Sequence, residues 1–182
     1  MAVGVGFILS LCFANLLPKE VYGSYKFVLS MAALIGAFSL TGLGDAVTRA
    51  SARGHEGVLK KGFETGLKWS IPMIIVGLGV SIYYLAQGDS ELSISIFIAV
   101  LFSSLLACSN LYGPYLKGRK LFKTEAVYGF AISIIPPLVL LATIFLTHRV
   151  LYIILIYFFT ITSTSLFFYL KTLRRFTSHA TP

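Results

Sequence analysis

Six long stretches of this chain contain no Asp, Glu, Lys or Arg, and they restrict what it can fold into. An α-helix rises 1.5 Å per residue, so about 20 apolar residues cross a hydrocarbon layer of about 30 Å. Five of the stretches contain 18 to 25 residues and meet this length, whereas the first, at 17 residues, is marginal. With some polar residues added at their ends, the predicted spans are about 1–17, 27–49, 66–88, 92–116, 125–147 and 150–170.

The composition excludes an ordinary soluble protein. Of the 182 residues, 57% are hydrophobic and 12% are charged, whereas soluble domains contain about 25% charged residues. Transmembrane β-strands alternate apolar and polar residues, and residues 150–159 show no such alternation. Residues 1–17 lack the Lys and Arg that begin a secretory signal peptide, which favours a transmembrane helix there. We therefore predict an all-α, polytopic membrane protein whose six helices form a single lobe over 1–182.

The basic residues predict the topology because they gather in alternate connections. Twelve of the fifteen Lys and Arg lie between the second and third uncharged stretches, between the fourth and fifth, or in the tail. Such residues stay in the cytoplasm, so both termini are predicted to be cytoplasmic. The net charge of +8 then marks orientation and contact with a membrane lipid bilayer rather than with nucleic acid. These twelve residues are Arg49, Arg53, Lys60, Lys61, Lys68, Lys117, Arg119, Lys120, Lys123, Lys171, Arg174 and Arg175.

Small residues recur within the spans, at Gly42 and Gly44 in the second and at Gly77 and Gly79 in the third. Small residues allow helix backbones to approach closely in lipid, so packing is the expected role of these glycines. Before the third span, apolar residues recur every four positions from Leu59 to Ile71 with charged residues between them, as in an amphipathic helix that continues into the span.

A few polar residues and two prolines within the spans are candidates for a substrate path. Polar and ionisable groups in lipid are functional candidates by default. For the acid–base pair at positions 45 and 49, however, the spacing of four residues also fits a local ion pair near the interface. The double proline falls at the middle of the fifth span and predicts a broken or kinked helix, either beside a cavity or as a static packing kink. The candidates are Asn15, Asp45, Arg49, Asn110, Pro136 and Pro137.

No catalytic set is visible in the sequence. The three histidines lie in separate connections or the tail, and the two cysteines stand alone within spans. The spacing of these residues matches no metal site. We therefore expect neither an enzyme nor a bound metal or cofactor.

Two stretches resemble the polysaccharide biosynthesis or O-antigen flippases, a branch of the multidrug/oligosaccharidyl-lipid/polysaccharide exporters. The first is Leu-Pro-Lys-Glu-Val-Tyr-Gly-Ser-Tyr at 17–25, together with Leu-Gly-Asp-Ala-Val-Thr-Arg at 43–49 and the Ala-Arg that follows at 52–53. The second is Leu-Tyr-Gly-Pro-Tyr-Leu-Lys-Gly-Arg-Lys-Leu-Phe-Lys at 111–123. They are similar to the family's turn between its first two helices, to the end of its second helix, and to its fourth helix with the basic loop that follows.

The resemblance implies a fold of two lobes, each a six-helix bundle, around a central cavity. It implies translocation of a lipid-linked oligosaccharide across a bacterial or archaeal cytoplasmic membrane for cell-surface polysaccharide synthesis. The resemblance covers only the first lobe, so the chain is expected to be incomplete relative to the family and to require a second lobe as partner.

Three alternatives remain open from the sequence. A drug or cation antiporter of the same superfamily would use acidic residues deep in the membrane, and the predicted spans lack them. A membrane enzyme of polysaccharide assembly would need catalytic residues or a large outer loop. A non-functional fragment of a longer gene is the third alternative.

Overall fold

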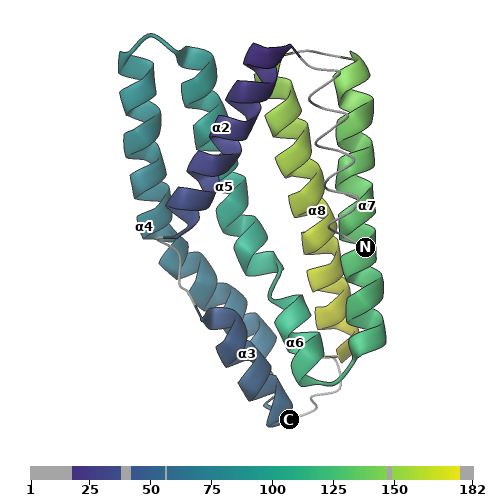
Figure 1. The fold of residues 1–182 in the computed structure, drawn as a ribbon. Helices are drawn as coiled ribbons and strands as arrows, with labels where there is room; N and C mark the ends of the chain where they lie inside the picture. Colours follow the sequence, from purple (N-terminus) through teal and green to yellow (C-terminus); the bar gives the residue numbers. More distant parts are fainter. Residues whose placement is uncertain (1–17, 38–41, 56, 147–148, 177–182) are drawn as a thin grey trace.

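The computed structural model describes residues 18–37, 42–55, 57–146 and 149–176, and all the secondary structure in these ranges is helical (Figure 1). The predicted all-α class is therefore confirmed for the described part of the chain. The helices are α2 (Lys19–Gly36), α3 (Leu43–Ala52), α4 (Val58–Ala86), α5 (Ser90–Ser109), α6 (Tyr112–Gly118), α7 (Phe122–Leu146) and α8 (Val150–Phe176).

Within the described residues, four segments are long and apolar enough to cross a membrane. They are α4, α5 together with α6, α7, and α8. This finding supports a multi-pass membrane protein. The first predicted span, 1–17, and its candidate Asn15 lie outside the described residues.

The second predicted span, 27–49, corresponds to two helices rather than one. Helix α2 already begins at Lys19, directly after Pro18, so the residues expected to connect the first two spans form its first turns. It ends at Gly36, and α3 begins only at Leu43. Gly42, which precedes α3, has a φ of 85°, a conformation that is easy for glycine and unfavourable for other residues. An α-helix cannot continue through such a residue, so α3 starts as a separate element.

Helix α5 lies at the centre of the bundle, where it packs against α2, α4 and α8 (Figure 1). The α4–α5 hairpin is closed by two buried serines, because the Ser93 hydroxyl donates to the Ser81 carbonyl at 2.7 Å and the two hydroxyls lie 2.9 Å apart. Buried hydroxyl groups that are paired in this way avoid the free energy of leaving a polar group unsatisfied in an apolar interior.

The two ends of the bundle differ in the number of basic residues that they contain. The start of α2, the α4–α5 turn and the start of α8 lie at one end of the bundle in Figure 1. Helices α3 and α6, the start of α7 and the end of α8 lie at the opposite end. The basic connections identified in the sequence therefore meet at one end, called here the basic end.

Helix α7 runs without interruption from Phe122 to Leu146, through both Pro136 and Pro137. The predicted break at the double proline is therefore wrong as a break in the helix. Pro136 is buried, and the Ser133 hydroxyl donates to the Gly129 carbonyl one turn earlier at 2.8 Å. The Pro136 side chain is thus packed inside the protein rather than exposed on the outside of α7.

Candidate functional site

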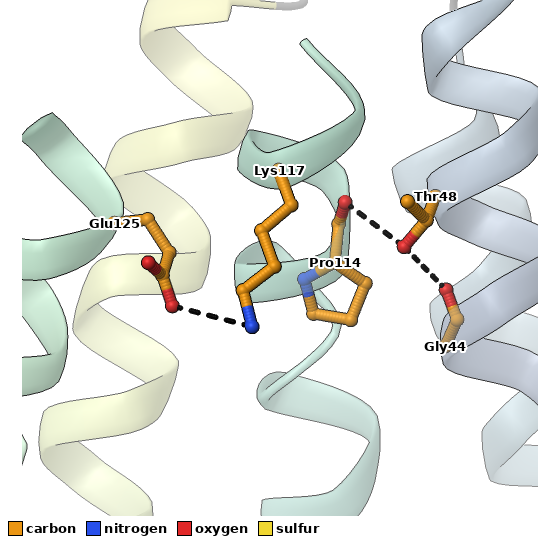
Figure 2. A network of polar contacts seen from close by, with 5 residues as sticks. All are labelled: Gly44, Thr48, Pro114, Lys117 and Glu125. Carbon is orange, nitrogen blue, oxygen red and sulfur yellow. Dashed lines mark hydrogen bonds and ion pairs between the residues drawn. The ribbon is translucent and has the colours of Figure 1, made fainter. Parts of the chain in front are cut away.

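Helices α3 and α6 are far apart in the sequence but pack directly against each other at the basic end. The Thr48 hydroxyl joins them, because it lies 2.9 Å from the Gly44 carbonyl oxygen of its own helix and 3.3 Å from the Pro114 carbonyl oxygen of α6 (Figure 2). The position of α3 is therefore set by a segment that follows it by more than sixty residues.

An ion pair connects α6 to α7. The Lys117 ammonium lies 3.6 Å from a carboxylate oxygen of Glu125 (Figure 2). Lys117 belongs to the last turn of α6 and Glu125 to the first turn of α7, the ends where each charge is favoured by the helix dipole. Both side chains are partly exposed, so the pair contributes about 1 kcal/mol or less to stability and mainly orients the short α6–α7 connection.

A cavity of about 250 Å³ lies where the start of α3, the first half of α4 and the α5–α6 junction meet. Backbone is accessible in this cavity, since part of its wall is glycine. Gly42 directly precedes α3 and has no side chain to cap the first amide groups of that helix. The glycine and polar residues that line the cavity are Gly42, Gly44, Gly66, Ser70, Cys108 and Asn110.

Two of the polar side chains at the cavity are held by neighbours. The Ser70 hydroxyl donates to the Gly66 carbonyl at 2.8 Å and lies 3.9 Å from the Cys108 sulfur. The carbonyl oxygen of the Asn110 side chain accepts a hydrogen bond from the Ser165 hydroxyl of α8 at 2.6 Å. The Asn110 amide NH₂ has two further donors. Among the candidates that lie in the described ranges, Asn110 is thus the one at the cavity.

The span formed by α5 and α6 is interrupted beside this cavity. Pro114 has no amide hydrogen to donate to the Asn110 carbonyl four residues earlier. That carbonyl instead accepts from the Gly113 amide at 3.1 Å, and a turn separates the two helices. A break of the kind expected at Pro136 and Pro137 is thus present in the span formed by α5 and α6.

The other described candidates are not among the residues that line the cavity. Asp45 and Arg49 are both exposed on α3. The ion pair expected between them is not formed; the ion pair seen among the described residues joins Lys117 to Glu125. Pro136 and Pro137 belong to α7, which contributes no residue to this cavity among those described. Thr48, Ser70 and Ser165 were not predicted.

The described residues contain no group of three or more His, Cys, Asp or Glu side chains arranged to hold a metal ion. Comparison with protein-family models, with characterised proteins and with solved structures gives no match to this chain. The resemblance to flippases therefore depends on the residues quoted above.

Proposed function

We propose that this chain is one lobe of a membrane flippase that translocates a lipid-linked oligosaccharide for cell-surface polysaccharide synthesis. The observation that supports this most is the contact between α3 and α6. Helix α3 contains the whole 43–49 stretch and α6 contains residues 112–118 of the 111–123 stretch, the two stretches that resemble the flippase family. The 250 Å³ cavity lies beside the contact between these helices. Two separate parts of the resemblance thus belong to one structural unit.

The chemistry at this end suits an anionic sugar carrier. Arg49 is exposed on α3, and Lys117 and Arg119 lie on or just after α6. Guanidinium and ammonium groups attract phosphate, and Arg can hold it through two hydrogen bonds. The Asn110 amide beside the cavity provides donors for a sugar hydroxyl. The lipid tail would stay in the bilayer, so translocation needs no covalent step.

We propose that the basic end faces the cytoplasm, so that the lipid-linked oligosaccharide binds from the cytoplasmic side. Twelve of fifteen basic residues belong to it, and the positive-inside rule directs such residues to the cytoplasm. Both termini would then face the cytoplasm of a bacterial or archaeal cell. Single cysteines at Gln87 and Lys123, in a chain with both native cysteines replaced by alanine, would react from opposite sides of the membrane. Labelling of Lys123→Cys from outside intact cells would contradict the orientation.

An antiporter for cationic drugs is less compatible with the described spans, because their carboxylates lie near helix ends. Glu64 is the seventh residue of α4, Glu91 the second of α5 and Glu125 the fourth of α7. A cation carried through the middle of the membrane would need a deeper acidic partner. We further propose that a second six-helix lobe completes the transporter.

Binding, rather than transport, tests the proposal on this chain alone. Protein in phosphatidylglycerol-containing nanodiscs would be titrated with a fluorescent polyprenyl-diphosphate oligosaccharide and, separately, with a fluorescent quaternary ammonium drug. The excess of phosphatidylglycerol in the nanodiscs keeps the nonspecific binding of anions to the basic residues the same in every titration. We expect the diphosphate sugar to bind and Arg49→Gln to weaken its binding about tenfold.

Lys60→Gln on α4 is the matched control, since it removes one exposed charge from the basic end outside the α3–α6 unit. It should leave the affinity within about twofold. Binding of the drug without binding of the diphosphate sugar would reject the flippase and favour the antiporter. Equal losses in Arg49→Gln and Lys60→Gln would reject the site on α3.

A further inference from the structure

One face of α8 near its end contains two exposed apolar side chains followed by three exposed cations. Relative to the first of them, these residues stand at positions 0, 3, 4, 7 and 8, the spacing that places side chains on one side of a helix. They line a groove of about 490 Å³. Its described lining residues are Phe167, Leu170, Lys171, Arg174 and Arg175.

Polarity changes in one direction along this groove. Phe167 is 61% exposed and Leu170 is 44% exposed, and both lie further from the helix end than the cations. Arg175 is the eighth residue after Phe167, so the two lie about 12 Å apart along the helix axis. The end of α8 belongs to the basic end of the bundle. Because α8 is long and apolar enough to cross a membrane, we expect its last turns at the membrane surface. A phospholipid has the same order, with apolar chains inward and a charged phosphate outward.

Lys171 is held in the groove by two aromatic rings. Its ammonium lies 5.6 Å from the centre of the Tyr128 ring of α7 and 6.0 Å from the centre of the Phe167 ring. Tyr128 is itself fixed, because it stacks on Phe168 with ring centres 4.3 Å apart and an angle of 13° between the ring planes. These cation–π contacts orient the ammonium without neutralising it.

No described carboxylate neutralises the three cations. The ion pair present in the described ranges joins Lys117 to Glu125 and involves none of them. Basic residues in a last helical turn complement the helix dipole, and that role needs neither the exposed Phe167 and Leu170 nor a groove. These side chains are therefore complementary to an anionic ligand that also has an apolar part.

We propose that this groove binds the phosphate headgroup of an anionic phospholipid from the surrounding bilayer. Lys171, Arg174 and Arg175 contact the phosphate, and Phe167 and Leu170 contact the first part of an acyl chain. The site is separate from the α3–α6 cavity and does not depend on the proposed transport activity. It ties the end of α8 to the lipid surface at the basic end.

The test counts bound lipid by native mass spectrometry. Purified full-length chain in detergent is titrated with phosphatidylglycerol, and separately with phosphatidylcholine of the same chain length. The charge variant is Lys171→Gln/Arg174→Gln/Arg175→Gln, and its control, Lys60→Gln/Lys61→Gln/Lys68→Gln, removes the same charge from exposed positions of α4. The apolar variant, Phe167→Ala/Leu170→Ala, keeps every charge, and its control is Val127→Ala/Phe130→Ala on the exposed side of α7.

We expect phosphatidylglycerol to bind more tightly than phosphatidylcholine. A basic residue near an anionic surface contributes about fivefold in affinity, so the charge variant should lose about a hundredfold. The apolar variant should lose about tenfold, and both controls should stay within about twofold of the original chain. The apolar variant changes no orientation signal, so its result stands even if the charge variant inserts wrongly.

Four results would overturn the proposal. They are equal binding of the two lipids, equal losses in the charge variant and its α4 control, an unchanged affinity in the apolar variant, and displacement of the lipid by an equal concentration of inorganic phosphate. The last would mark a site for phosphate itself rather than for a lipid.

Discussion

Gly118 of α6 lies in direct contact with Ser51 of α3, and the Ser51 hydroxyl together with the Thr48 carbonyl occupies the space that a Cβ on Gly118 would take. Gly118 and Ser51 are both buried. In lipid, apolar side chains gain little by leaving the solvent, so close contact through small residues contributes much of the helix association. The α3–α6 unit therefore depends on a residue with no side chain at position 118.

Gly118→Ala should separate α3 from α6 and lower the stability of the chain by about 1–3 kcal/mol, the usual effect of overpacking. Gly113→Ala in the same helix is the matched control, because a Cβ there meets no atom within 4 Å. The control should be neutral or slightly stabilising. Thermal unfolding in detergent, followed by the reactivity of the buried Cys108, measures both. Equal melting temperatures for the two variants would contradict the contact.

Gly77 has the same role between α4 and α5. A Cβ on Gly77 would lie 2.5 Å from a methyl carbon of Val100, whereas a Cβ on Gly79, two residues later, would meet nothing within 4 Å. We expect Gly77→Ala to destabilise by about 1–3 kcal/mol and Gly79→Ala to have little effect. Val100→Ala removes the clashing methyl groups, so the double variant should be more stable than the sum of the single effects predicts. Additive effects in thermal unfolding would show that the two residues do not touch.

The sequence identified the membrane-crossing helices better than their buried faces. The apolar repeat from Leu59 to Ile71 predicts an amphipathic helix, yet along it Leu59 is buried whereas Leu67 and Ile71 are exposed. The buried side of α4 is formed mostly by small residues, which include Gly62, Gly66, Ser70, Gly77 and Ser81. An apolar repeat does not identify the buried face here, because in a membrane the large apolar side chains also face the solvent, which is lipid.

The site was predictable only in part, for a related reason. Asn110 was recognised as a polar residue within a span, and that signal is local. The partner of Thr48 is the Pro114 carbonyl 66 residues away, and no local pattern indicates such a contact. Pro114, four residues after Asn110, is a local signal for the interruption after α5, but a proline near the end of a span costs a helix less than one at its centre.

Tyr128→Phe should leave the chain equally stable or stabilise it by about 1 kcal/mol. The Tyr128 hydroxyl is buried, and no hydrogen-bond partner for it lies in the described part of the chain. Phe keeps the stack on Phe168 and removes the unpaired polar group. Tyr128→Leu, which loses the stack, should destabilise, and thermal unfolding of the two variants measures the contrast. A clear loss of stability in Tyr128→Phe would mean that the hydroxyl has a partner.

The hydrogen bond between Asn110 and Ser165 should contribute modestly to stability, although it is short and Ser165 is fully buried. Ser165→Ala removes the donor, whereas Asn110 is exposed and keeps access to other partners. Interhelical hydrogen bonds in membranes are worth about 0.6 kcal/mol on average, with an upper range near 2. We therefore expect Ser165→Ala to cost about 1 kcal/mol or less, and Asn110→Ala to cost no more, since a lone Ser165 hydroxyl can turn to a carbonyl of its own helix.

The double variant should be more stable than the sum of the two single effects predicts, by about the energy of the bond. Ser163→Ala, at an exposed position of the same helix, controls for the loss of a hydroxyl. Additive effects of the two single substitutions in thermal unfolding would contradict the bond as a stabilising tie between α8 and the cavity.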